Sequence, residues 1–99
     1  MLHHVTLLTL RPDAPAEQVA TILEHLAPLP ALIDTLRSYD VRADLGINPD
    51  NAHVCVRADF DDTDGYLVYR DHPAHRHVID THIAPYLQGR STVQIDGGG

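Results

Sequence analysis

Four segments of the chain have the alternation or the composition that is typical of β-strands. They are residues 2–10, 36–45, 52–60 and 91–96. The first segment is rich in Val, Leu and Thr and stops at Pro12. Because successive side chains of a strand point to opposite faces, its residues divide into two sets. One set is Val5, Leu7 and Thr9, and the other is His4, Thr6 and Leu8.

The strand predicted over residues 52–60 has the clearest division between its faces. Its apolar face consists of Val54, Val56, Ala58 and Phe60, and its other face of His53, Cys55, Arg57 and Asp59. We expect the apolar face to pack against helices, with Leu23 and Leu26 opposite, because a half-buried strand turns its apolar side chains to the core.

Four further segments are predicted to be helical from their spacing or from helix-start signals. In residues 16–27 the apolar side chains fall on one arc, and Pro28 ends the pattern. A short helical turn is expected in residues 31–36. Asp62 is expected to cap a second helix that runs to about Asp71, since its carboxylate can accept from a free backbone N–H. Pro73 suits the first turn of another helix, which we expect to run to about residue 84.

The order of these elements predicts an α+β, ferredoxin-like βαββαβ fold in one domain over residues 1–96, followed by a flexible glycine tail at 97–99. This topology leaves helices on one face of the sheet only. The face without helices is expected to carry a mixed set of side chains on the first and third strands, namely His4, Thr6, Leu8 and Cys55. A second copy packing there would close a cavity between two sheets. We therefore expect a homodimer that buries more than about 1,200 Å².

Composition narrows the range of functions. The 99 residues carry a formal net charge of −7 and include no lysine. Because nucleic acids and anionic membranes both require a basic patch, we expect neither as a partner. The apolar stretch of residues 5–10 is far too short to span a bilayer, and no basic segment precedes it. A single cysteine, Cys55, fits a reducing compartment, so we expect a cytoplasmic protein.

The chain has 8 histidines, and the helix predicted after Pro73 places two of them on its inner side. At about 100° per residue, His75 and His82 fall on the same arc as Val78. The residues expected on the outer arc are Arg76, His77 and Asp80. The break at Pro73 can turn Tyr69 and His75 towards one pocket. A phenol beside an imidazole is a workable acid–base pair, because histidine titrates near neutrality and tyrosine can donate to a developing oxyanion.

The string His72-Pro73-Ala74-His75, preceded by Tyr69 and by Phe60 at the end of a strand, resembles the stress-responsive dimeric α/β-barrel (Dabb) family. The early histidine of the opening strand, His4, and the closing Gln94-Ile95-Asp96 also suit that family. The resemblance covers nearly the whole chain. Within the family, the functionally clearest relatives are of the olivetolic acid cyclase type.

The resemblance implies a ferredoxin-like protomer that pairs with a second protomer and encloses a pocket between its sheet and its helices. It also implies cofactor-independent, intramolecular aldol-type chemistry on a small hydrophobic β-keto substrate, as in a polyketide cyclase or lyase. In that chemistry His75 is the general base and Tyr69 donates to the enolate oxygen, while His4 and His72 line the substrate pocket. The chain has one Phe and no Trp. It therefore departs from the aromatic pocket of those cyclases, and the substrate is not carried over.

Other interpretations of the same residues stay open. His75 and Tyr69 are also typical of a packed core, His72 of a helix cap, and His82 of an interface. A non-catalytic stress-response or small-ligand-binding barrel is therefore the alternative function. No zinc motif and no glycine-rich phosphate loop occurs, so we expect no metal and no nucleotide. A nucleophilic Cys55 is disfavoured by its place in mid-strand, and a cofactor-free monooxygenase by the lack of Trp.

Overall fold

The computed structural model describes residues 1–97, in which one sheet of four strands carries a layer of helices. In chain order the elements are β1 (Leu2–Leu10), α1 (Gln18–Leu26), α2 (Leu29–Leu32), β2 (Ser38–Ala43), β3 (Val54–Phe60), α3 (Thr63–Asp71), α4 (Pro73–Val78), the π-helical turn η1 (Ile79–Ile83), the 3₁₀ turn η2 (Ala84–Tyr86) and β4 (Leu87–Asp96). This order confirms the βαββαβ prediction.

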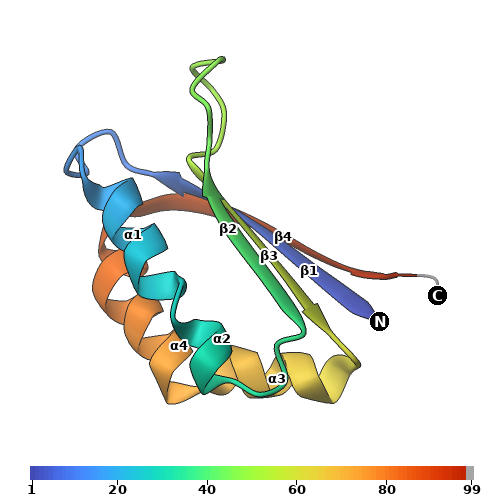
Figure 1. Cartoon of the computed structure of the whole chain (residues 1–99). Coiled ribbons are helices and arrows are strands. Elements are labelled where there is room, and N and C mark those ends of the chain that lie inside the picture. Colours follow the sequence, from blue (N-terminus) through green and yellow to red (C-terminus); the bar gives the residue numbers. More distant parts are fainter. Residues whose placement is uncertain (98–99) are drawn as a thin grey trace.

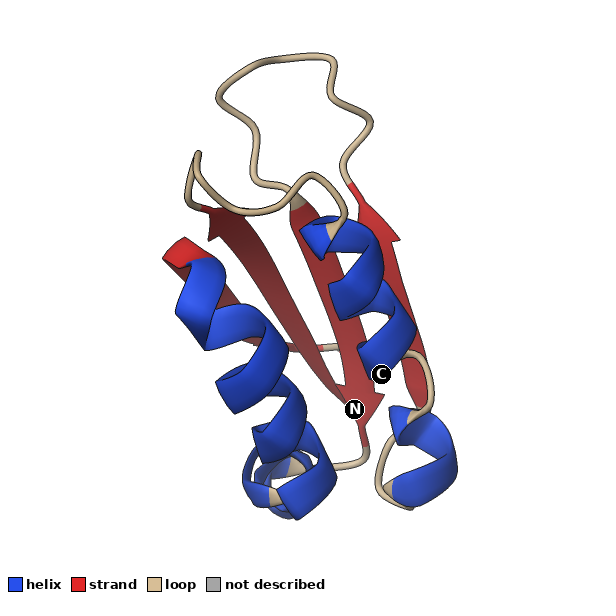
Figure 2. Cartoon of the chain, turned by 90° about the vertical axis from the view of Figure 1, so that its left-hand side faces the viewer, coloured by secondary structure: helices blue, strands red, loops and turns tan. Residues whose placement is uncertain are grey.

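The strands pair antiparallel in the order β2-β3-β1-β4, which is the ferredoxin-like arrangement. All helices of residues 1–97 gather on one face of the sheet (Figures 1 and 2). We call this side the covered face and the opposite side the open face. The loop between β2 and β3 projects from one end of the sheet, and the start of β1 and the end of β4 lie at the other (Figure 1).

The pairing of β1 with β3 decides which side chains of β1 meet the helices. His4 pairs with Ala58, and directly paired residues share a face. Consequently His4, Thr6 and Leu8 are buried on the covered face. This corrects the prediction that they lie on the face without helices. The prediction was wrong because β1 has apolar side chains on both faces, with Leu7 on the open face. Alternation within the strand therefore cannot show which face is turned to the helices.

The dry core lies between the covered face and the helices. Its largest fully buried side chains are Phe60, Ile22, Leu26, Leu29, Ile33 and Val54. The expected register of β3 is therefore confirmed, with Val54 and Phe60 turned to the helices. Of the two side chains expected opposite them, Leu26 is fully buried and Leu23 is partly buried at the edge of the core.

The helix that follows Pro73 is shorter than expected. Regular α-helix ends at Val78, and the chain continues as the π-helical turn η1. This turn closes the helical run, and the last carbonyl groups of a helix have no partner within the helix. The buried side chain of Gln18 supplies one, because its Nε2 donates to the carbonyl oxygen of His82 at 2.8 Å.

The last strand begins at Leu87, earlier than its predicted start at residue 91, and its register with β1 shifts between Thr9 and Leu10. The backbone N–H of Gly97 donates to the carbonyl oxygen of Met1 at 2.7 Å, so this part of the predicted tail is bonded to the N-terminal strand. Residues 98–99, the rest of that tail, lie outside the described residues. In the described part of the chain, no helix has the length and apolar character needed to cross a membrane.

Candidate active site

A cavity of about 230 Å³ lies between the covered face of β1 and β4 and the helical layer formed by α3, α4 and η1. Its polar lining includes His4, Tyr69, His75, Arg76, Arg90 and Thr92. Its apolar lining includes Leu8, Val56, Ile79 and Ile83. The cavity is formed by a single chain and lies between the sheet and the helices, as the family resemblance implied.

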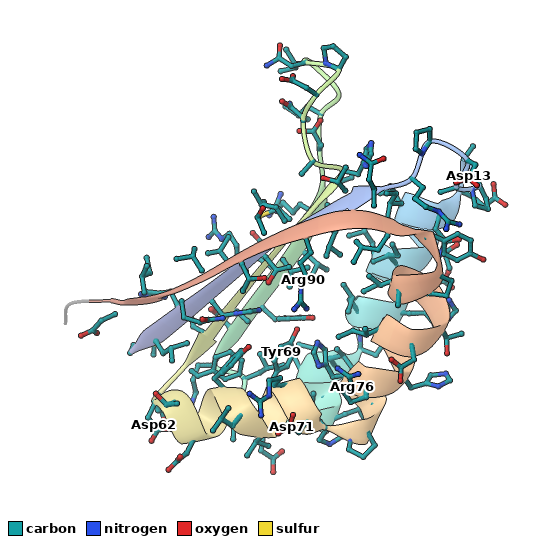
Figure 3. The ribbon with its side chains drawn as sticks, turned by 180° about the vertical axis from the view of Figure 1, so that it is seen from behind. Asp13, Asp62, Tyr69, Asp71, Arg76 and Arg90 are labelled. Atoms are coloured by element: carbon teal, nitrogen blue, oxygen red, sulfur yellow. The ribbon has the colours of Figure 1, made fainter. Side chains whose placement is uncertain are left out.

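The break between α3 and α4 brings Tyr69 and His75 together. His72 adopts an extended backbone conformation, and Pro73 is the first residue of α4. Since proline disfavours helical geometry at the residue before it, the helix axis changes here. The rings of Tyr69 and His75 have their centroids 4.1 Å apart, and both side chains line the cavity. Figure 3 shows the space between Tyr69 on the helical layer and Arg90, which points towards it from β4.

The same break determines which nitrogen of His75 carries the proton. In a continuous helix the carbonyl group of Arg70 would accept from the N–H of Ala74. That N–H instead donates to Nδ1 of His72 at 3.1 Å. The imidazole of His75 takes its place, with Nδ1 lying 3.0 Å from the carbonyl oxygen of Arg70. A carbonyl oxygen can only accept, so Nδ1 carries the proton and Nε2 holds the lone pair.

The lone pair on Nε2 of His75 is accessible. Every buried side-chain nitrogen and oxygen of the described residues has a hydrogen-bond partner, and Nε2 makes no hydrogen bond within residues 1–97. It must therefore be open to the cavity that His75 lines. Burial lowers the pKa of His75 below its ordinary value, against the hydrogen bond to the Arg70 carbonyl, which raises it. The ring is consequently a neutral base at neutral pH.

Tyr69 is linked to a second phenol, that of Tyr39 at the start of β2. The two hydroxyl oxygens lie 3.0 Å apart. Burial raises the pKa of Tyr69 to about 12 and also raises that of Tyr39. Both phenols therefore stay protonated at neutral pH. One hydrogen bond uses only one of their two protons, so when Tyr39 donates to Tyr69, the hydroxyl of Tyr69 is free to donate into the cavity.

His4 forms part of a hydrogen-bonded wall. Its Nδ1 accepts from Nε2 of Gln94 at 2.9 Å, and its Nε2 donates to Oγ1 of Thr6 at 3.0 Å. Thr6 in turn bonds Oγ1 of Thr92 at 3.1 Å. Burial is the main cause that lowers the pKa of His4 to about 4. With both ring nitrogens occupied and the ring neutral, His4 shapes the cavity and has no free lone pair.

The structure thus brings together three of the four residues singled out from the sequence. His4, Tyr69 and His75 line one cavity. His72 is not among the lining residues, which corrects its predicted placement; as the N-cap of α4 it adopts the alternative role that the sequence also indicated. His82, expected on the inner arc with His75, stacks instead on the ring of His25 at 3.9 Å. The turn η1 causes this difference, because the helical period changes after Val78.

Three residues at or beside the cavity were not found from the sequence. Tyr39 has the place of an ordinary core residue in an alternating strand, and nothing local marks it. Arg76 was expected on the outer arc but lines the cavity. Arg90 lies one position before the predicted last strand, and in the longer β4 it pairs with Leu8 on the covered face. If the last strand had been predicted to start at Leu87, alternation would have indicated which face Arg90 lies on.

The described residues contain no group of three or more His, Cys, Asp or Glu side chains arranged to hold a metal ion. Cys55 pairs with Leu7 on the open face, as expected from alternation, and does not line the cavity.

Comparison with known proteins adds three findings. The model of the family described as Stress responsive A/B Barrel Domain (Dabb) matches residues 2–96. No curated protein matches the chain. Among solved structures, a dimeric ferredoxin-like protein of unknown function from Thermobifida fusca is 37% identical, with a TM-score of 0.86 over 95% of this chain and 88% of its own.

Two more distant structures share the fold. A dimeric ferredoxin-like protein of unknown function from Bacteroides fragilis is 23% identical, with a TM-score of 0.84 over 96% of this chain and 94% of its own. A hydroxynitrile lyase from Passiflora edulis is 12% identical, with a TM-score of 0.79 over 99% of this chain and 95% of its own.

Proposed function

The chain belongs to the stress responsive A/B barrel domain family, and we propose that it is a cofactor-independent lyase or cyclase. The proposed reaction is aldol-type carbon–carbon chemistry on a small β-keto substrate. The observation that carries the proposal is the open Nε2 of the neutral His75 beside the protonated phenol of Tyr69, within one cavity.

In the proposed reaction, Nε2 of His75 takes a proton from the carbon next to a carbonyl group of the substrate. The electron pair of that C–H bond moves into an enolate, and the hydroxyl of Tyr69 donates a hydrogen bond to the enolate oxygen. The enolate carbon then attacks a second carbonyl carbon of the same molecule and forms the new C–C bond. The proton on Nε2 passes to the resulting alkoxide, so His75 returns to its starting state. The reverse sequence is a lyase reaction.

The surroundings of the two groups support these roles. Tyr39, by donating to the oxygen of Tyr69, would polarise that hydroxyl and make it a stronger donor. The hydrogen bond to the Arg70 carbonyl would hold the ring of His75 in one orientation. In this scheme His4 lines the substrate cavity, and His72 is a positioning residue that acts through the start of α4.

The fold is shared with a hydroxynitrile lyase, so a protein of this architecture can be an enzyme. The alternative function is a barrel that binds a small ligand without converting it. The assay described next distinguishes the two functions.

The test is a turnover assay. Purified protein is incubated with a series of linear poly-β-keto thioesters and with the corresponding β-hydroxy ketones for the lyase direction, and products are followed by mass spectrometry. Cyclised or cleaved product above the no-protein rate, lost in His75→Gln, supports the proposal. If compounds of both series bind to the cavity and none is converted, the protein is a binding module.

We also propose a homodimer that forms through the open face. This face carries exposed apolar side chains on two neighbouring strands: Leu7 is 41% exposed, Val93 51% and Ile95 52%. The similar proteins from Thermobifida fusca and Bacteroides fragilis are described as dimeric. Light scattering at micromolar concentration should give twice the chain mass, and Leu7→Asp should shift the protein to monomer. A monomeric wild-type protein would contradict this proposal.

A further inference from the structure

Among the described residues, one guanidinium group at the cavity has no acidic partner. Arg70 is paired with Asp71 at 2.9 Å, and Arg76 lies 3.5 Å from Asp80. The side chain of Arg90 forms neither an ion pair nor a hydrogen bond within residues 1–97. Within residues 1–97, five arginines have a carboxylate within ion-pair distance, whereas Arg57 on the open face and the exposed Arg90 at the cavity do not.

The position of Arg90 directs this charge into the cavity. Arg90 pairs with Leu8 on the covered face, and its side chain points from β4 towards Tyr69 in Figure 3. Its positive charge is one of the causes that lower the pKa of both His4 and His75. Both imidazoles are therefore close enough to experience its field, and neither balances it.

The charge balance of the cavity points to a ligand with one negative charge. The two histidines are neutral, the phenols are protonated, and the other two arginines have carboxylate neighbours. An anion at Arg90 would supply the missing partner, and its attraction to the guanidinium would offset the hydration that it loses on entering the cavity. A carboxylate suits a guanidinium because two parallel N–H···O bonds can form between the two planar groups.

The size of the cavity limits the remainder of the ligand. A cavity of about 150 Å³ is sufficient for benzene, and this one is about 230 Å³. It therefore has room for one ring or a short folded chain together with a carboxylate. Apolar side chains on the helical side, Ile79 and Ile83, would contact the carbon skeleton.

We propose that the cavity takes a small keto acid whose carboxylate is bound by Arg90, so that the carbonyl group of the ligand lies between Tyr69 and His75. This inference rests on the proposed function for the role of the carbonyl group, but the anion site is defined independently by Arg90. The family resemblance implied a small hydrophobic keto ligand, and the present proposal adds a carboxylate to it. Arg90 would then select substrates by charge and orient them towards the base.

The experiment measures the binding of benzoate, of its neutral counterpart benzamide and of inorganic phosphate by calorimetry, and follows the histidine ring signals by NMR. Benzoate should bind about tenfold or more tightly than benzamide, as expected for a charge-assisted hydrogen bond. The signals of His4 and His75 should shift, while that of the exposed His77 should not. Arg90→Gln should remove the preference for benzoate. Arg57→Gln, which removes a cation from the open face, should retain it.

Three results would overturn the anion site: equal binding of benzoate and benzamide, a preference that survives in Arg90→Gln, or phosphate binding more tightly than benzoate. His75→Gln separates this proposal from the proposed function. If that variant binds benzoate normally, the anion site stands whether or not any keto compound is converted. If wild-type protein converts keto thioesters but shows no preference for benzoate, the anion site fails and the proposed reaction remains.

Discussion

The two faces of the sheet give neighbouring histidines opposite environments. His3 and His4 are adjacent in β1, so their side chains point to opposite faces. On the open face, Nδ1 of His3 bonds the carboxylate of Asp59, which also accepts from Ser38 at 2.5 Å. Those two hydrogen bonds hold the pKa of the Asp59 carboxyl below its usual value. On the covered face, burial lowers the pKa of His4 to about 4 and keeps its ring neutral.

This contrast shows that the position in the sheet, and not the residue type, decides what a histidine can do in this protein. Burial on the covered face keeps the ring of His4 neutral and the phenols of Tyr39 and Tyr69 protonated, which suits proton transfer. The open face leaves polar groups partly hydrated and paired with one another. Variants of the covered layer, most of them matched with a variant of a residue outside it, test this contrast.

Replacement of the proposed base should have the largest effect. His75→Ala should remove most turnover, and His75→Gln should lower kcat by about 10²–10⁴-fold, the usual contribution of a general base. The glutamine side chain can still donate to the Arg70 carbonyl, so the loss would not be due to the helix break. His77→Ala, on the exposed side of α4, should have no effect. Normal turnover in His75→Gln would refute the assignment.

Because burial lowers the pKa of His75, the acid limb of kcat/KM should lie below pH 6.5. Activity should rise with pH through that pKa and then level off. An acid limb at or above pH 6.5 would mean that another group controls the reaction.

The next largest effect is expected from truncation of a core side chain on the covered face. Phe60→Ala should lower the free energy of unfolding by about 3–5 kcal/mol, since a fully buried ring leaves a cavity behind. Cys55→Ala, on the open face of the same strand, should lower it by less than about 1 kcal/mol. Urea unfolding followed by circular dichroism measures both. A cost below about 1 kcal/mol for Phe60→Ala would contradict the register of β3.

Removal of the proposed donor should have a smaller effect than removal of the base. Tyr69→Phe should lower kcat by about 10²-fold, the lower range for loss of one oxyanion donor. Tyr39→Phe should reduce kcat by less, because it removes only the phenol that polarises Tyr69. The folded state should remain intact in both variants, as checked by thermal unfolding. An equal loss in the two variants would show that the pair acts as one structural unit.

The smallest effect concerns stability and pH. The pKa of His4 is lower in the folded protein than in the unfolded chain, so its contribution is present above pH 6.5 and is lost as the pH falls towards about 4. The loss should amount to about 1–2 kcal/mol after allowance for the solvent that reaches the ring. The free energy of unfolding is measured with urea at pH 7.5 and at pH 4.5. The drop between the two pH values should be smaller in His4→Gln than in the wild-type protein, and unchanged in His3→Gln. If both variants lose the same amount as wild-type protein, His4 is not the group responsible.

The residue pattern was sufficient to predict the fold class, the order of the elements and the break between Tyr69 and His75. These features depend on local physics: period-two alternation in β3, the cap at Asp62, and the geometry that Pro73 imposes on the residue before it. The last of these is a property of a few consecutive residues, and it is sufficient to turn Tyr69 and His75 towards one cavity.

The residue pattern did not predict which face of β1 is covered, how η1 redirects His82, or that Tyr39 and Arg90 lie at or beside the cavity. Each depends on contacts between segments far apart in the chain. The pairing of His4 with Ala58 selects one of two equivalent alternations in β1, and the early start of β4 aligns Arg90 with Leu8. The periodicity of one segment does not show which strand or helix it packs against. These features therefore follow from strand pairing and from packing across the whole fold.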